Sequence, residues 1–86
     1  MYQIFYEKKI FKELDKIPTH DVKKIKEVFQ ELSKDPFPNG TKKISGKDNL
    51  YRLQQADYRI LYSPNTKEKQ IYILLVRNRK DSYKNL

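Results

Sequence analysis

The chain has 86 residues, which limits it to one small domain. It contains no cysteine and one histidine, which excludes a disulfide scaffold and multi-histidine or cysteine-bearing metal centres. No apolar run approaches the roughly 20 residues that span a bilayer, and the N-terminus lacks a signal-peptide pattern, so we expect a cytoplasmic protein without a membrane partner. The formal net charge of +8 favours polyanionic or acidic partners.

The first half of the chain predicts one strand and two helices. Residues 2–6 are rich in aromatic and β-branched side chains, which is typical of a strand. Apolar residues recur at helical spacing over 7–17, and Pro18 is expected to end this helix. Thr19 is the predicted N-cap of a second helix. The apolar face of that helix comprises Val22, Ile25, Val28, Phe29 and Leu32.

The second half predicts strands. Residues 42–45 fit a short edge strand. The runs 50–55 and 58–63 alternate between apolar and polar side chains and are separated by only two residues, which predicts an antiparallel hairpin. A turn is expected at 64–68. The apolar run 70–76 predicts a central strand buried on both faces.

This order of elements predicts a single α+β domain over residues 1–86. Two N-terminal helices cover one face of a small twisted, mainly antiparallel sheet, and the other face is partly open. Alternation along the hairpin places Arg52 and Gln54 on the side opposite Tyr51 and Leu53. The open face is therefore where polar chemistry is expected.

Positive charge is concentrated in the second half of the chain. Residues 1–40 carry eight basic and seven acidic side chains, whereas residues 41–86 carry eleven and four. All arginines follow residue 50: Arg52, Arg59, Arg77 and Arg79. Arginine presents a planar fork that binds phosphate oxygens bidentately. If the last strand pairs with the one carrying Arg59, the guanidinium groups of Arg52, Arg59 and Arg79 converge on one phosphate. The alternative, solvated strand residues with minor ion pairs, stays open.

Other catalytic arrangements are not expected from this sequence. The chain has two glycines and no Gly-rich phosphate loop, and its second half offers only scattered carboxylates, so no metal site is predicted. His20 is expected to be a solvated or capping histidine. Tyr83 lies in a polar tail, where it either stacks on an unpaired RNA base or only pins the tail to the sheet.

Several motifs follow one another along the chain. They are the opening G-x-K-K-I-x-G at 40–46, the Tyr-Arg pairs at Arg52 and Arg59, and the closing R-K-D-x-Y at 79–83. In this order and spacing the sequence resembles the RelE/ParE superfamily of type II toxin–antitoxin toxins, specifically its RelE branch. The resemblance spans nearly the whole chain. It implies the two-helix, one-sheet fold described above.

The resemblance also implies an activity, an endoribonuclease (mRNA interferase) that cuts messenger RNA in the ribosomal A site without metal or cofactor and so inhibits translation. It implies a cognate acidic RelB-like antitoxin. Arg52 matches a basic strand position, Arg59 an arginine at the scissile phosphate and Arg79 an arginine near the leaving group. Tyr83 matches a tyrosine that stacks on a base. These four residues form the predicted catalytic set.

The chain departs from the family pattern at three positions. Gln54 stands where a second lysine is frequent, Asn78 where His or Lys often precedes the arginine, and Arg77 where glycine is common. Because arginine stays protonated, with a pKa above ~12, we assign no general base. Binding of RNA and the ribosome is expected from the surrounding basic and polar residues: Lys42, Lys43, Lys47, Gln54, Arg77 and Lys80.

The expected reaction is attack of an RNA 2′-hydroxyl on its own 3′-phosphate, which leaves a cyclic phosphate and a free 5′-hydroxyl. Two alternatives stay open at this point. One is a DNA gyrase inhibitor without nuclease activity, as in the ParE branch of the superfamily. The other is a non-catalytic RNA-binding module.

Overall fold

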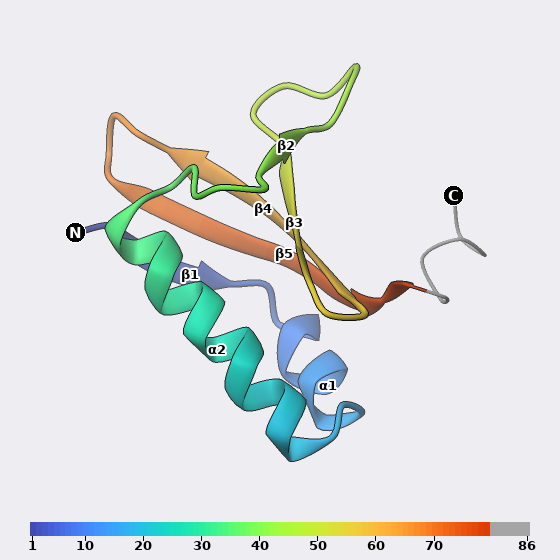
Figure 1. The fold of residues 1–86 in the computed structure, drawn as a ribbon. Helices are drawn as coiled ribbons and strands as arrows, with labels where there is room; N and C mark the ends of the chain where they lie inside the picture. The colour runs from blue at the N-terminus through green and yellow to red at the C-terminus, as the bar shows by residue number, and fades with distance from the viewer. Residues whose placement is uncertain (80–86) are drawn as a thin grey trace.

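Two helices cover one face of a five-stranded sheet in the computed structural model, which describes residues 1–79 (Figure 1). The elements follow the predicted order, and the short edge strand is present. Their bounds are β1 (Gln3–Tyr6), α1 (Lys9–Asp15), α2 (Thr19–Lys34), β2 (Lys42–Lys43), β3 (Tyr51–Gln55), β4 (Tyr58–Asn65) and β5 (Gln70–Asn78). The predicted α+β class is confirmed.

The strands lie in the order β1-β5-β4-β3-β2. β1 runs parallel to β5, and the other neighbouring pairs are antiparallel. β3 and β4 form the predicted two-residue hairpin, in which Ala56 has a φ of 53° and supplies the left-handed backbone that such tight turns require. β5 is a central strand, flanked by the first strand of the chain and by β4.

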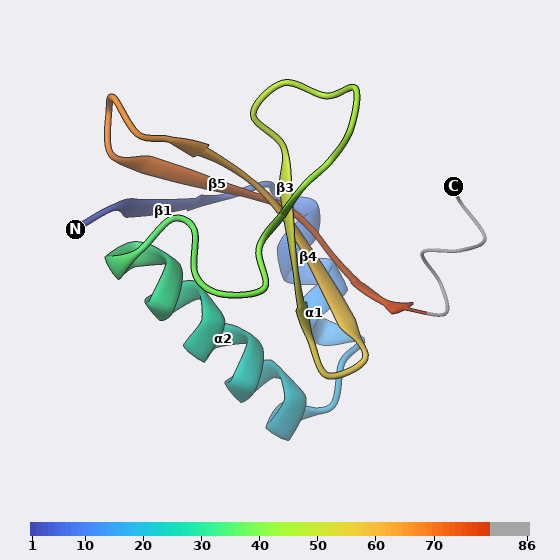
Figure 2. The same ribbon diagram turned by 45° about the horizontal axis from the view of Figure 1, so that its top comes forward.

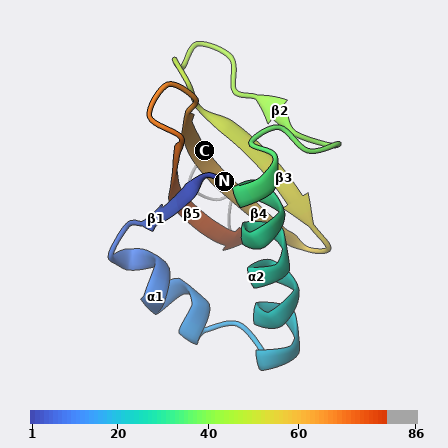
Figure 3. The same cartoon turned by 90° about the vertical axis from the view of Figure 1, so that its left-hand side faces the viewer.

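The two helices lie side by side and antiparallel against the sheet (Figure 3). α2 begins at Thr19, and Pro18 precedes it with a ψ of 143°. The prediction of Thr19 as N-cap is therefore wrong, because Thr19 is already helical and the carbonyl oxygen of Pro18 accepts from the backbone N–H groups of Asp21 and Val22. None of the helices in the described part of the chain combines the length and the apolar character needed to cross a bilayer.

The core lies between the helices and the sheet. The helices contribute Ile10, Ile25, Val28, Phe29 and Leu32, and the strands contribute Leu53, Tyr58, Ile60, Tyr62, Ile71, Ile73 and Val76. Burying a large apolar side chain of this kind stabilises the fold by about 1.5–3 kcal/mol. Tyr62 is fully buried, and its hydroxyl donates to the carbonyl oxygen of Pro36 over 2.7 Å. This bond fixes the segment that leads from α2 to β2.

The predicted turn at 64–68 is displaced. β4 continues through Pro64 and Asn65, and the turn occupies 66–69. The β3 partners of β4 end at Tyr62, so Pro64 lies where β4 has lost one neighbour. A residue without an N–H is tolerated at such an edge, which is why the proline does not end the strand.

The strand predicted over 70–76 is central but not buried on both faces. Tyr72 is 41% exposed, and Leu75 is half-buried. Both helices lie on the other side of the sheet, so the second face of β5 has no covering element among residues 1–79. The apolar composition of residues 70–76 does not distinguish the covered face of β5 from the uncovered one.

Tyr58 joins the sheet to the first turn of α2. Its hydroxyl donates to a carboxylate oxygen of Asp21 over 3.1 Å. Burial, reinforced by Asp21, raises the pKa of Tyr58 above its ordinary value.

Replacing Tyr58 by phenylalanine is expected to lower the free energy of unfolding by about 1–2 kcal/mol at pH 7, because a hydrogen bond to a partly exposed carboxylate is lost. The folded-state pKa is raised, so the tyrosine contribution is fully present below the unfolded pKa of about 10 and disappears as pH rises through the folded pKa. Urea unfolding of both proteins between pH 7 and 11 measures this. A difference that stays constant above pH 10 would contradict the assignment.

Candidate functional site

The face of the sheet opposite the helices carries the arginines. Along β4, burial alternates without interruption: Tyr58 and Ile60 are buried against the helices, whereas Arg59 and Leu61 are half-buried on the other side. Partners in an antiparallel ladder project to the same face. The register of β4 therefore identifies the neighbouring residues on this uncovered face.

Three adjacent strands bring a row of polar side chains together. Gln54 on β3 is the partner of Arg59, and Arg59 is in turn the partner of Arg77 on β5. Arg52, two residues before Gln54, shares the face and is paired with Leu61. We call Arg52, Gln54, Arg59 and Arg77 the arginine face. It concentrates three permanent positive charges on three adjacent strands.

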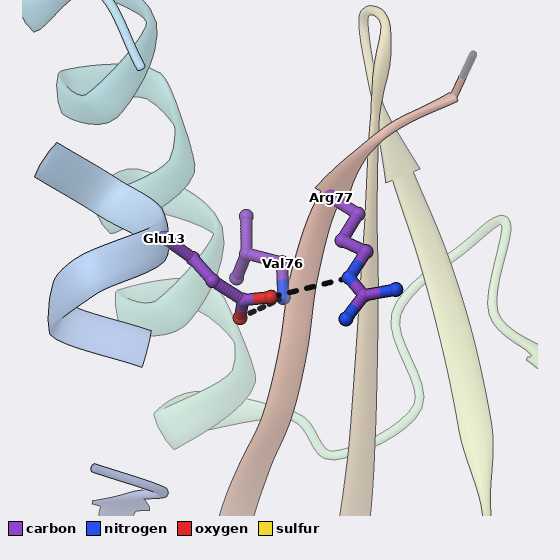
Figure 4. Close-up of polar contacts among 3 residues, drawn as sticks. All are labelled: Glu13, Val76 and Arg77. Atoms are coloured by element: carbon purple, nitrogen blue, oxygen red, sulfur yellow. Dashed lines mark hydrogen bonds and ion pairs between the residues drawn. The ribbon is translucent and has the colours of Figure 1, made fainter. Parts of the chain in front are cut away.

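A carboxylate from α1 holds one member of this row (Figure 4). Glu13 Oε2 lies 3.4 Å from Nε of Arg77, and Glu13 Oε1 accepts a hydrogen bond from the backbone N–H of Val76 over 3.1 Å. The side chain of Glu13 is only 17% exposed. Nε faces Glu13, and one of the two terminal nitrogens of the Arg77 guanidinium points away from it.

The local reason for this contact is the length of β5. β1 pairs with β5 only as far as Tyr6 and Ile73, whereas β5 continues to Asn78. Beyond Ile73, α1 lies against this edge in place of a strand. The Glu13 carboxylate therefore accepts the hydrogen bond from the Val76 N–H that the carbonyl oxygen of a neighbouring strand would otherwise accept.

Arg79 lies just past the end of β5, as expected. Its backbone N–H donates to the carbonyl oxygen of Asp57 over 2.6 Å, which ties the end of β5 to the β3–β4 turn (Figure 2). Its side chain is exposed. Arg79 thus lies next to the end of the arginine face that Arg59 and Arg77 form, but outside the paired strands.

The remaining predicted residues are dispersed. Lys42 is the partner of Arg52 and extends the arginine face to β2, whereas Lys43 is the partner of Tyr51 on the opposite face. Lys47 lies in the exposed segment between β2 and β3. The side-chain amide of Gln54 donates to the carbonyl oxygen of Ala56 over 3.0 Å. Lys80 and Tyr83 lie outside the described residues.

The buried phenols do not belong to this site. Burial raises the pKa of Tyr62, as it does for Tyr58, and both hydroxyls lie on the helix side of the sheet. Both tyrosines therefore stay protonated at neutral pH. Within residues 1–79, no three His, Asp or Glu side chains are grouped as metal ligands would be.

Sequence reasoning missed Glu13. It lies 64 positions before Arg77, on a helix whose acidic and basic residues alternate without a distinguishing pattern. Only the parallel pairing of β1 with β5, which brings α1 to the edge of β5, reveals the contact.

Comparison with known proteins identifies relatives of this chain in sequence and in fold. Residues 3–83 match the family model described as ParE toxin of type II toxin–antitoxin system, parDE. A chain of the archaeal RelE–RelB complex from Pyrococcus horikoshii is 31% identical, with a TM-score of 0.82 over 91% of this chain and 94% of that one. A curated relative from Methanocaldococcus jannaschii bearing the toxin name RelE1 is 28% identical over 98% of this chain and 97% of its own length. Isolated RelE from Escherichia coli, at 16% identity and a TM-score of 0.78, covers 99% of this chain and 98% of that one, and shares the fold.

Proposed function

The chain belongs to the ParE toxin family of type II toxin–antitoxin systems, within the RelE/ParE superfamily, and from that premise we propose that it is a ribosome-dependent endoribonuclease. It cleaves messenger RNA in the ribosomal A site, without a metal ion, and so inhibits translation in the cytoplasm. The fold positions a cationic surface rather than a deep pocket, which suits a substrate that arrives already held by another particle.

One observation carries this proposal: Arg59 and Arg77 are direct neighbours across β4 and β5, and Arg52 shares their uncovered face. Like charges side by side on a sheet destabilise the fold, by about 0.2–1 kcal/mol for a directly opposite pair. The ion pair with Glu13 offsets part of this repulsion, and an anion placed over the row offsets more of it. A scissile phosphate is an anion whose geometry the guanidinium fork matches.

The proposed reaction is an internal transesterification. The 2′-oxygen forms a bond to the adjacent phosphorus, the bond from phosphorus to the 5′-oxygen breaks, and a 2′,3′-cyclic phosphate and a 5′-hydroxyl result. The 2′ proton leaves and the 5′-oxygen gains one, so no electron acceptor is needed. Arg52 and Arg59 bind the non-bridging oxygens, and Arg79 stabilises the departing 5′-oxygen. Stabilisation of developing charge by preorganised donors is the main contribution expected.

Binding to the ribosome is assigned to four lysines, of which Lys42 extends this row and Lys43 lies on the opposite face. Lys42, Lys43, Lys47 and Lys80 contact phosphates of the ribosomal RNA without contacting the reacting atoms. Tyr83 stacks on a base next to the cleavage site. The ribosome aligns the 2′-hydroxyl with the phosphorus, which reduces the catalytic demand on the protein.

A RelB-like antitoxin is the proposed protein partner. The similar archaeal RelE was solved in complex with RelB, and the net charge of +8 suits an acidic, partly disordered chain. The helix side offers it an apolar groove of about 660 Å³ between β1, α1 and α2. Phe11 and Tyr6, which both line this groove, are 60% and 41% exposed and lie with their ring centroids 6.0 Å apart, and adjoining exposed aromatic side chains support the assignment of this surface to a partner.

The test uses purified toxin with translating ribosomes and a defined message. We expect cleavage within the A-site codon and 5′-hydroxyl ends downstream, mapped by primer extension, and no cleavage after addition of a cognate RelB-like antitoxin. If the protein binds ribosomes but leaves the message intact, it is a non-catalytic RNA-binding module instead.

A second candidate function is inhibition of DNA gyrase, because the matching family model carries the ParE description. Gyrase inhibition requires that the toxin bind the gyrase protein, and it does not require the arginine face. Supercoiling by gyrase, measured with the same toxin preparation, separates the two. Loss of supercoiling with an intact message favours gyrase inhibition.

A further inference from the structure

The uncovered face of the sheet also carries a pair of stacked aromatic rings. Phe5 on β1 is the register partner of Tyr72 on β5, and their ring centroids lie 5.2 Å apart with an interplanar angle of 19°. Tyr72 is 41% exposed. A near-parallel aromatic pair at the surface of a small domain is a feature that core packing does not require.

The pair lies on the same face as the arginines. Tyr72 is the partner of Ser63 on β4, and Ser63 follows Arg59 and Leu61 in the alternation of that strand. Ser63 lies four residues from Arg59, which is about 13 Å along a strand. Between them the face is covered by Leu61 and its partner Leu75. The sheet therefore presents a cationic end, an apolar middle and an aromatic end.

Contacts within the sheet restrain the orientation of Tyr72. Its ring is held by Phe5, and its hydroxyl donates to Oε1 of Gln70 over 3.0 Å. A ring held in this way loses little conformational freedom when another flat group stacks on it. Nucleobases are such groups, and every base has a face that stacks.

We propose that Phe5 and Tyr72 form a stacking site for an unpaired nucleobase of the RNA strand whose phosphate lies on the arginine face. The inference rests on the proposed function in so far as that function supplies single-stranded RNA. Charge favours RNA as the occupant, because the row of arginines on the same face attracts a polyanion. The half-buried leucines between the two ends add an apolar surface. A single strand lying along β4 reaches both ends.

The test measures binding of short single-stranded RNA whose 2′-hydroxyls are all methylated, so that it lacks the nucleophile and is not cleaved. For Tyr72→Leu we expect roughly five- to 100-fold weaker binding, the usual loss when one stacking contact is removed. A matched oligonucleotide in which every base is replaced by an abasic residue reports phosphate contacts alone, and here Tyr72→Leu should bind as the wild type does.

Two further variants serve as controls. Tyr72→Phe keeps the ring and is expected to bind within about twofold of the wild type. Tyr6→Leu removes a tyrosine of equal exposure, 41%, that lies in the groove on the helix side, and it should also leave binding unchanged. Thermal unfolding followed by circular dichroism establishes that each variant is folded, and Phe5→Leu replaces Tyr72→Leu if the latter is not.

The inference is overturned if the wild type does not bind the base-bearing oligonucleotide more tightly than the abasic one. It is also overturned if Tyr72→Leu weakens binding of the two oligonucleotides by the same factor. It is also overturned if Tyr72→Leu impairs only the antitoxin complex or self-association, measured by light scattering, since the rings would then be a protein contact. Failure of the nuclease proposal is a separate result, because the methylated RNA reports stacking whether or not the wild type cleaves a message on ribosomes.

Discussion

Replacing Arg59 by alanine is expected to lower the single-turnover rate of message cleavage by about 10²–10³-fold, the usual effect of deleting one preorganised donor. Arg59 lies on β4 between Gln54 and Arg77, so it has a neighbour from the arginine face on either side. Its Nε is buried, so the side chain emerges from the sheet in a restricted orientation. Quench-flow or hand-mixed time courses with programmed ribosomes and excess toxin measure the rate.

Two variants separate geometry from charge. Arg59→Lys keeps the charge but not the bidentate fork, and most of the rate loss should persist. Lys47→Ala removes the same unit of charge from the exposed segment between β2 and β3, so it should affect ribosome affinity and its salt dependence rather than the rate at saturation. If folded Arg59→Ala cleaves the message at the wild-type rate, Arg59 is not a catalytic residue.

The parts of the fold that the sequence predicts well are those governed by a local period. The helical spacing of Ile25, Val28 and Leu32 identifies the buried face of α2, and the two-residue alternation of β4 identifies the face that carries Arg59. Each of these patterns is a direct consequence of helix or strand geometry. Such patterns need no knowledge of the neighbouring elements.

The errors arise where a neighbour decides the outcome. Pro64 continues β4 because β3 has already ended beside it, and Tyr72 is exposed because no helix covers that side of β5. In both cases the residue type alone favours the wrong answer: a turn for the proline, and a buried position within an apolar run for Tyr72. The presence or absence of a neighbouring element is a tertiary property.

The candidate site shows the same division. Its arginines are conspicuous in the sequence, but which of them is the neighbour of Arg59 depends on the register between β4 and β5. That register is shifted between Leu61 and Tyr62, and it brings Arg77 opposite Arg59. Arg79 follows the strand and is tied to Asp57 instead. A bulge of this kind leaves no mark that composition or spacing reveals.

Replacing Glu13 by alanine is expected to lower the free energy of unfolding by about 1–3 kcal/mol, because the buried N–H of Val76 loses its acceptor. For a domain of this size, each kcal/mol corresponds to a fall in Tm of about 4–8 °C. The ion pair with Arg77 contributes less, since its cationic side chain is 35% exposed and such pairs contribute about 0–1 kcal/mol. The hydrogen bond to the backbone therefore dominates the effect.

Glu13→Gln tests this ranking, because the amide oxygen still accepts from Val76 but the amide group cannot accept from Arg77 through its nitrogen. Glu13→Gln and Arg77→Gln should each cost less than about 1 kcal/mol, well below the cost of Glu13→Ala. Calorimetric melting at low and at high salt measures all three variants, and only the ion-pair contribution should diminish with salt. If Glu13→Gln has the same Tm as Glu13→Ala, the ion pair with Arg77, and not the hydrogen bond to Val76, joins α1 to β5. In that case α1 acts on the arginine face through the charge of Arg77.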